Sequence, residues 1–269
     1  MTEKLLEVKH LKKSFGFVTA VDDVSFEMSV GDSVGIVGES GCGKSTLVRL
    51  ISGLQRPDAG EILVSGQFGN GDRRGEKKCH INMVFQDPID SFDPRFTVFQ
   101  SLYEALCHTV KCKKTEGRAR VMEALRLVSL PLEYMDRKLS SLSGGECQRV
   151  AIARVILTEP RLFICDEATS ALDVSVQAQM IQLFADLKKK RKFSYLFISH
   201  DLAVVACLCT KILVMYKGKI VERGEVSEIM EHPRHPYTKL LVDCAKAFSS
   251  ERMDLDSTLP DIPGDMETW

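Results

Sequence analysis

Alternating and continuous apolar segments divide much of the chain into candidate strands. Residues 5–10 and 24–28 alternate apolar and polar side chains, as half-buried strands do. Short continuous apolar runs, typical of strands buried on both faces of a sheet, occupy residues 33–37, 161–165 and 195–198. Further strands are predicted at residues 61–64, 81–85, 212–216 and 219–222.

Apolar positions at helical spacing fill many of the segments between these strands. They predict helices at residues 47–54, 98–110, 116–128, 146–157, 174–190, 226–231 and 237–248. Residues 12–16 and 65–78 are expected to be loops, the second because it is rich in glycine and charge. Because strands and helices intermingle along the chain, the pattern favours an α/β fold.

The middle of the chain differs from the rest, because residues 87–160 have helical patterns and no strand pattern. A chain of 269 residues suits one large α/β domain with such an inserted subdomain. We therefore expect one domain over residues 1–248, with a helical subdomain inserted at about 87–160. Residues 249–269 are acidic and poor in apolar side chains, and are expected to be a flexible tail.

A glycine-rich loop joins the apolar run at 33–37 to the helix near Leu47. It fits G-x-x-x-x-G-K-[ST], and its residues are Gly38, Glu39, Ser40, Gly41, Cys42, Gly43, Lys44, Ser45 and Thr46. Strand, loop and helix start together form a phosphate cradle, because loop N–H groups and a helix N-terminus attract an anion. Lys44 is expected to reach the β- and γ-phosphates of a nucleotide, and the Ser45 hydroxyl to hold Mg²⁺.

Cys42 lies inside this loop, two residues from Lys44 and at the start of a helix. Such a setting lowers the pKa of a thiol. Thiol reagents are therefore expected to inactivate the protein, and bound nucleotide is expected to protect it.

Polar residues follow several of the apolar strands. Gln86 follows the strand at 81–85, and His200 ends the one at 195–198. Asp166 and Glu167 end another, where one carboxylate could hold Mg²⁺ and the next could polarise a water molecule. The two acids could instead form a surface turn, and a lone histidine is more often structural. Their shared place at carboxyl ends of strands favours one active site.

Composition limits the other functions open to the chain. The formal net charge of −1 gives no global basic field for nucleic acid. The nine cysteines are scattered, which indicates reduced thiols, without a disulfide framework or a zinc finger. No apolar run is long enough to cross a bilayer, and the first residues have no signal-peptide pattern. The protein is therefore expected to be cytoplasmic.

These motifs, in this order, resemble the ATP-binding subunit of an ABC transporter over roughly residues 5–231. Residues 38–45 match Walker A, 162–166 match Walker B, and 170–173 match the D-loop, which contains Asp173. Gln86 matches the Q-loop, His200 the H-loop, and Phe15 the aromatic residue that stacks on adenine. The ABC signature, more diagnostic than Walker A, is matched by Ser143, Gly144, Gly145 and Glu146.

The resemblance implies a P-loop NTPase core with a mixed sheet, an N-terminal antiparallel β-subdomain and an inserted helical subdomain. It implies that two such domains close head to tail around two ATP molecules, each signature contacting the ATP on its partner's Walker A loop. Glu167 and His200 would be catalytic, through water activation and binding of the γ-phosphate. Gln86 would contact Mg²⁺ together with Ser45 and Asp166.

Other segments are similar to peptide and nickel importers. These are residues 84–88, 91–98, 172–178 and the late His-Pro-Tyr-Thr run at 235–241. The resemblance implies a second ATPase subunit, identical or paralogous, and two membrane permeases docked on the helical subdomain. It also implies an extracytoplasmic solute-binding protein as an indirect partner, and a place on the cytoplasmic face of the membrane. An accessory ATPase of phosphonate breakdown, in a carbon–phosphorus lyase complex, shares the late run and is the alternative.

The chain departs from the family at a few positions. Glu146 and Cys147 follow the signature glycines where glutamine is common, and Cys165 replaces an aliphatic residue before Asp166. Many relatives have a late cysteine cluster resembling an iron–sulfur site. The last region here has only Cys244, so no such cluster is expected. Because the chain has one cassette and no heptad arm, DNA-repair and ribosome-bound ABC ATPases fit poorly.

Overall fold

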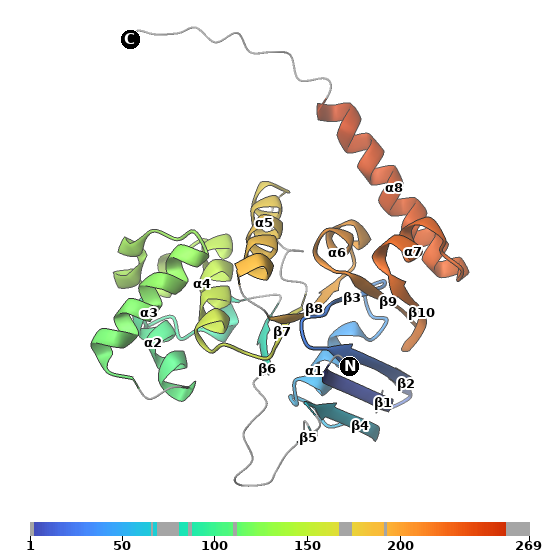
Figure 1. Cartoon of the computed structure of the whole chain (residues 1–269), viewed down its shortest axis with the longest axis horizontal. Coiled ribbons are helices and arrows are strands. Elements are labelled where there is room, and N and C mark those ends of the chain that lie inside the picture. The colour runs from blue at the N-terminus through green and yellow to red at the C-terminus, as the bar shows by residue number, and fades with distance from the viewer. Residues whose placement is uncertain are drawn as a thin grey trace, which may run out of the picture.

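Two sheets of different kinds organise the chain in the computed structural model, which describes residues 3–65, 67–68, 81–85, 88–109, 112–166, 174–190 and 193–256 (Figure 1). The first sheet is antiparallel, with strand order β2-β1-β4-β5. Its strands are β1 (Lys4–Phe15), β2 (Val18–Ser29), β4 (Ala59–Val64) and β5 (Gln67–Phe68). This is the antiparallel N-terminal subdomain that the family resemblance implies.

The second sheet has strand order β10-β9-β3-β8-β7-β6 and is mixed. Its strands are β3 (Ser33–Val37), β6 (Ile81–Val84), β7 (Leu162–Asp166), β8 (Ser194–Ser199), β9 (Lys211–Tyr216) and β10 (Lys219–Glu225). Neighbouring strands from β9 to β6 run parallel, whereas β10 pairs antiparallel with β9. The carboxyl ends of β3, β6, β7 and β8 therefore share one edge.

Both faces of the central strands are covered, as their continuous apolar runs predict. In β8, Tyr195 and Phe197 pack into a core that includes residues of several helices between 98 and 208. The intervening Leu196 and Ile198 pack into a second core with the helix at 44–51 and the antiparallel sheet. Because successive side chains of a strand point to opposite faces of the sheet, β8 contributes to a hydrophobic core on each face.

The helices lie in distinct places around the mixed sheet. Figure 1 shows α2, α3 and α4 grouped on one side and α1 beneath β3, near β1 and β4. The long helices are α1 (Lys44–Ile51), α2 (Val98–Thr109), α3 (Lys114–Leu127), α4 (Gly144–Leu157), α5 (Val174–Lys190) and α8 (Pro236–Asp256). Short ones are α6 (Leu202–Leu208), α7 (Val226–Glu231), and the 3-10 turns η1 (Ile89–Ser91), η2 (Leu132–Asp136) and η3 (Leu139–Ser141).

The prediction of a loop at residues 12–16 is wrong for its first four residues, which extend β1. Ser14 pairs with Thr19 and Phe15 with Val18 across a two-residue turn. The Asp58 carboxylate accepts the Ser14 N–H at 2.7 Å and the Lys13 ammonium at 2.7 Å. These contacts come from residues distant in sequence, so local pattern could not reveal them.

Two helices differ from the sequence analysis. Helix α6 was not predicted, although Asp201 caps it by accepting the N–H groups of Ala203 and Val204. It packs so closely on β3 that a Cβ at Gly35 would come within 2.0 Å of Val205 Cγ1. Helix α8 continues to Asp256, past the end expected near residue 248.

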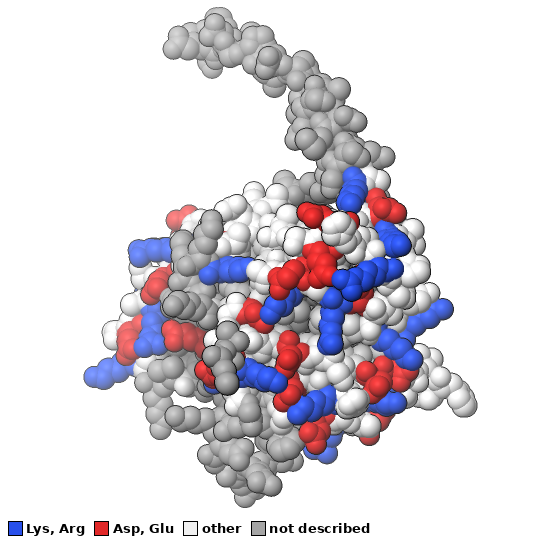
Figure 2. Space-filling view, turned by 45° about the vertical axis from the view of Figure 1, so that its right-hand side comes forward, with Lys and Arg blue, Asp and Glu red and all other residues white. Residues whose placement is uncertain are grey.

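Among the described residues on the face drawn in Figure 2, Lys and Arg side chains are mixed with Asp and Glu and form no continuous basic surface. This agrees with the formal net charge of −1. The described part of this face therefore lacks the electrostatic footprint typical of nucleic-acid binding.

Candidate nucleotide-binding site

The glycine-rich loop connects the end of β3 to the first turn of α1, as the motif predicts. Gly43 has a φ of 108°, and a Cβ there would lie 2.0 Å from the Ala20 carbonyl oxygen. A Cβ at Gly38 would lie 2.2 Å from the Met215 carbonyl oxygen. Glycine is needed at both positions because backbone from β2 and β9 closes around the loop.

Lys44 lies folded over the inside of this loop and is only 3% exposed. Its ammonium donates to the carbonyl oxygens of Gly38, at 2.8 Å, and Glu39, at 2.9 Å. These contacts hold the cation above the N-terminus of α1, where a phosphate would bind. The loop therefore encloses one buried positive charge at the predicted phosphate site.

Ser45 and Asp166 meet at the adjacent strand end. The Ser45 hydroxyl donates to Asp166 Oδ1 at 3.4 Å, and Asp166 is 6% exposed at the end of β7. A hydroxyl and a carboxylate are hard oxygen ligands of the kind that Mg²⁺ prefers. These two side chains fit a magnesium ion that would also bind nucleotide phosphates.

The strand register brings the other predicted residues to the same edge. Val37, just before the loop, pairs with Ser199, and Asp166 pairs with Ile198. His200 follows Ser199, so the register places its backbone beside the start of the loop and the end of β7, where Asp166 lies. The His200 side chain is exposed. Gln86, Glu167 and Asp173 lie outside the described residues.

Phe15 ends β1 and is 48% exposed. The Lys13 ammonium lies 5.6 Å from the centroid of its ring. A ring with this exposure is accessible to a base. Stacking of Phe15 on adenine stays a prediction.

The second predicted anion site is the start of α4, where Ser143 is the N-cap. Glu146 and Ser143 form a capping box, with the Ser143 N–H donating to Glu146 Oε2 at 2.8 Å. The Tyr134 hydroxyl donates to Glu146 Oε1 at 2.6 Å and holds the pKa of that carboxyl below its usual range. Both carboxylate oxygens thus accept a hydrogen bond within the chain, so Glu146 orders the start of this helix. A Cβ at Gly144 would have nothing within 4 Å, which leaves open space at this helix end.

The two helix N-termini belong to different parts of the fold. Helix α4 packs against α2, α3 and β6, whereas α1 packs against β2 and β7. Figure 1 shows α1 and α4 well separated across the sheet. One chain therefore presents two helix N-termini, each predicted to bind an anion, that pack against different elements of the fold.

The expectation of a lowered pKa at Cys42 is wrong. Burial raises the pKa of this thiol, and the nearby Lys44 ammonium lowers it by less. Cys42 is only 4% exposed. The thiol belongs to the hydrophobic core that contains α1 and the antiparallel sheet, and the resulting loss of hydration outweighs the charge of Lys44.

Alkylation of Cys42 by N-ethylmaleimide is therefore expected to be slow at neutral pH and to accelerate as the pH rises, because the thiolate is the reacting species and burial raises the pKa of this thiol. The exposed Cys107, Cys207 and Cys244 are expected to react first. Peptide mass spectrometry over a pH series measures each site. If Cys42 reacts fastest at pH 7, burial does not control its reactivity.

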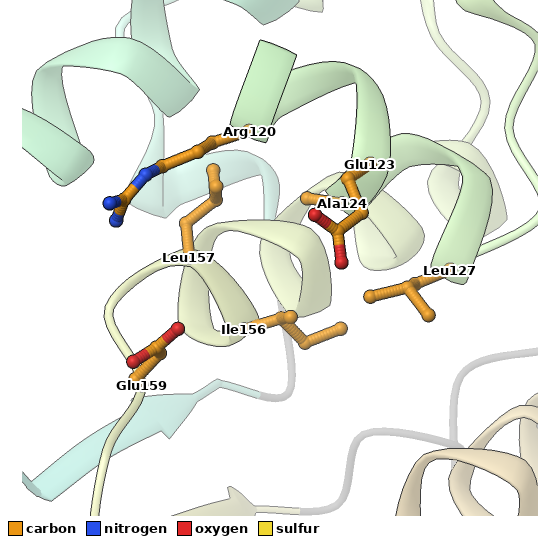
Figure 3. A pocket seen from close by; sticks show the side chains of 7 residues that line it. All are labelled: Arg120, Glu123, Ala124, Leu127, Ile156, Leu157 and Glu159. Atoms are coloured by element: carbon orange, nitrogen blue, oxygen red, sulfur yellow. The ribbon is translucent and has the colours of Figure 1, made fainter. Parts of the chain in front are cut away.

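A cavity of about 330 Å³ lies away from these residues, between α3 and the end of α4 (Figure 3). Its lining includes Arg120 and Glu123 of α3 and Ile156 and Leu157 of α4. None of the predicted nucleotide-binding residues lines it. The cavity is therefore not the nucleotide site.

Two residues near the site were missed by the sequence analysis. Tyr134 holds Glu146, and the Tyr237 hydroxyl accepts the Glu39 N–H at 2.7 Å. The His-Pro-Tyr-Thr run that includes Tyr237 is a family pattern. Its sequence does not predict a contact with the phosphate loop, because Glu39 is 198 residues away.

Fold and site together define a P-loop nucleotide-binding protein of the α/β class. Comparison with known families makes this specific. The family described as "ABC transporter" matches residues 21–170, and the one described as "Oligopeptide/dipeptide transporter, C-terminal region" matches residues 221–267. The chain belongs to the ABC transporter family and is an ABC-type ATPase.

Individual relatives agree with this assignment. The chain is 45% identical over 251 residues to the oligopeptide transport ATP-binding protein OppF of Bacillus subtilis (strain 168), covering 90% of this chain and 82% of the relative. It is 39% identical over 277 residues to the dipeptide transport ATP-binding protein DppF of Escherichia coli (strain K12), covering 97% and 83%.

Solved structures show the same fold. The cassette MJ0796, solved as a dimer bound to ADP and Pi in a post-hydrolysis state, matches with a TM-score of 0.74 and 26% identity, covering 82% of this chain and 99% of that one. The cbiO1 protein of Clostridium perfringens matches with a TM-score of 0.75 and 25% identity, covering 94% and 99%. Among the described residues, no helix combines the length and apolar character needed to cross a bilayer.

Proposed function

We propose that this protein is the ATP-hydrolysing subunit of an importer for oligopeptides or dipeptides, bound to the cytoplasmic face of the membrane. The observation that carries the proposal is the joint presence of an ABC cassette and the oligopeptide/dipeptide C-terminal region in one chain. The relatives compared are named for oligopeptides and dipeptides, which favours peptides over nickel as cargo.

The catalytic unit would be a head-to-tail dimer with an identical or paralogous ATPase. The separation of α1 from α4 supports this arrangement, because each chain offers two half-sites that it does not join itself. Ser143, Gly144 and Gly145 would contact the ATP held by the partner's phosphate loop, with Asp173 at the dimer contact. Glu146 would serve by capping α4.

At each nucleotide site, Lys44 of the phosphate loop would bind the β- and γ-phosphates, and Phe15 at the end of β1 would stack on the adenine. Ser45, Asp166 and Gln86 would hold Mg²⁺, which neutralises phosphate charge when it is bound. Glu167 would orient and deprotonate the attacking water, and His200 would stabilise charge that develops on the γ-phosphate.

The helical part of the chain offers a place for a permease, which we propose as the partner. A groove of about 660 Å³ lies along α2 and α3. The rings of Phe99 and Tyr103 line this groove and stack with their centroids 5.4 Å apart. The Arg118 guanidinium lies 5.6 Å from the centroid of the Phe99 ring. An apolar floor with a charged rim suits a short amphipathic helix from a membrane protein.

Affinity purification from detergent-solubilised membranes of the host tests this proposal. The tagged full-length chain is expected to recover two membrane permeases, identified by mass spectrometry. Arg118→Glu is expected to reduce that recovery at least fivefold, because it reverses a charge in the groove. Arg120→Glu is the matched control: the same substitution two residues along α3, lining the other cavity (Figure 3).

Equal losses with both variants would contradict the groove as the docking site. Recovery of soluble enzyme subunits in place of permeases would overturn the importer and favour the phosphonate-breakdown alternative.

A further inference from the structure

Residues of the C-terminal part of the chain form hydrogen bonds with the backbone of the phosphate loop, the glycine-rich segment at 38–46. The Tyr237 hydroxyl, at the start of α8, accepts the Glu39 N–H at 2.7 Å across 198 residues of sequence. The Gly218 N–H, in the turn between β9 and β10, donates to the Cys42 carbonyl at 2.9 Å. Tyr237 lies within the region that matches the peptide-transporter C-terminal family.

Tyr237 and Lys44 bind opposite ends of one peptide unit. The Gly38 carbonyl accepts the Lys44 ammonium at 2.8 Å, and the N–H of the same peptide, that of Glu39, donates to Tyr237. A peptide unit is planar, so its carbonyl and N–H point in opposite directions. Fixing both ends therefore fixes its rotation, and with it the carbonyl that holds the Lys44 ammonium.

The Tyr237 hydroxyl is itself well fixed. The Glu222 carboxylate of β10 accepts the backbone N–H groups of Arg234, at 2.8 Å, and His235, at 2.9 Å, just before α8 begins. The Tyr237 ring packs on that of Tyr216 with centroids 4.4 Å apart. Burial raises the pKa of Tyr237, so its hydroxyl stays protonated at neutral pH. The contact to Glu39 thus comes from a rigid support.

We propose that Tyr237 is a positioning residue for nucleotide binding, which sets the phosphate loop's affinity for ATP by fixing the Glu39 peptide and, through it, Lys44. This inference rests on the nucleotide-binding role proposed for the loop. It gives the C-terminal region a physical connection to the ATP site. Because coupling between two sites is reciprocal, ATP binding is also expected to strengthen the contact of Tyr237 with the phosphate loop.

Tyr237→Phe tests the proposal, because it removes the hydroxyl and keeps the ring that packs on Tyr216. Tyr216→Phe is the matched control, since it removes a hydroxyl from the facing ring. ATP binding to the full-length chain is measured by isothermal titration calorimetry, with hydrogen exchange of peptides that contain Glu39 and the melting temperature of the free protein.

For Tyr237→Phe we expect the Kd for ATP to rise by at least twofold and up to about tenfold, the range set by loss of one neutral hydrogen bond. Exchange at Glu39 is expected to become faster, with a melting temperature equal to that of the control. A Kd within twofold of the parent, or an equal rise in the control, would overturn the inference. Lys44→Ala distinguishes failure of this inference from failure of the proposed function. Normal ATP binding in that variant would refute the nucleotide-binding role of the loop itself.

Discussion

Lys44→Ala is expected to weaken ATP binding by about 10- to 150-fold, because hydrogen bonds to a charged group contribute about 1.5–3 kcal/mol and each 1.4 kcal/mol is a factor of ten. Lys44 is the buried cation of the loop, held between the carbonyls of Gly38 and Glu39. Removing it leaves the phosphates with backbone N–H donors and the helix end alone.

Arg49→Ala is the control for this experiment, because Arg49 is a basic residue on the same helix, exposed to solvent near its last turn. It removes the same charge and is expected to leave the Kd for ATP within twofold of the parent. Calorimetric titration with ATP measures both variants, and circular dichroism confirms that each is folded. Unchanged affinity in Lys44→Ala would contradict the phosphate cradle.

Glu167→Gln is expected to bind ATP and to lower kcat by at least about 100-fold, the lower end of what a general base contributes. Glutamine keeps the size of the side chain but does not accept a proton. With hydrolysis blocked, ATP should hold two subunits together, so a stable dimer is expected by size-exclusion chromatography with ATP. The chain is run alone and, separately, mixed with any paralogous ATPase subunit that co-purifies with it, because the proposed partner is an identical copy or a paralogue.

The control places Ser143→Arg in the Glu167→Gln background. Arginine at the N-cap removes the capping hydroxyl and fills the open end of α4, so the ATP-dependent dimer is expected to disappear while ATP binding persists. Hydrolysis at the parent's rate in Glu167→Gln would refute its catalytic role. A dimer that survives Ser143→Arg would contradict a pocket completed across two chains.

The phosphate loop could be predicted in detail because its chemistry is local. Nine consecutive residues specify the turn, the cation and the hydroxyl proposed to hold Mg²⁺, and the flanking apolar runs specify the strand and helix. The same holds for the capping box of α4, since Ser143 and Glu146 are three residues apart. The apolar runs of β7 and β8 similarly indicated strands covered on both faces.

Other properties depend on which segments meet. The extension of β1 rests on pairing with β2 and on Asp58, and the raised pKa of Cys42 rests on its burial in the hydrophobic core. Helix α6 has seven residues, too few for a clear apolar period, and its place is set by close packing on Gly35. Each was misjudged because the deciding neighbour is distant in sequence.

The linear order of residues was enough to establish the α/β class, the phosphate loop, the signature helix and the family, because each depends on spacing within a few turns of chain. Only the folded chain shows the strand order and the burial of the Cys42 thiol. The same is true of the hydrogen bonds between Ser45 and Asp166 and between Tyr237 and Glu39. The reason is physical: hydrogen bonds and burial act over a few ångströms of space, and folding alone brings residues 198 positions apart to that range.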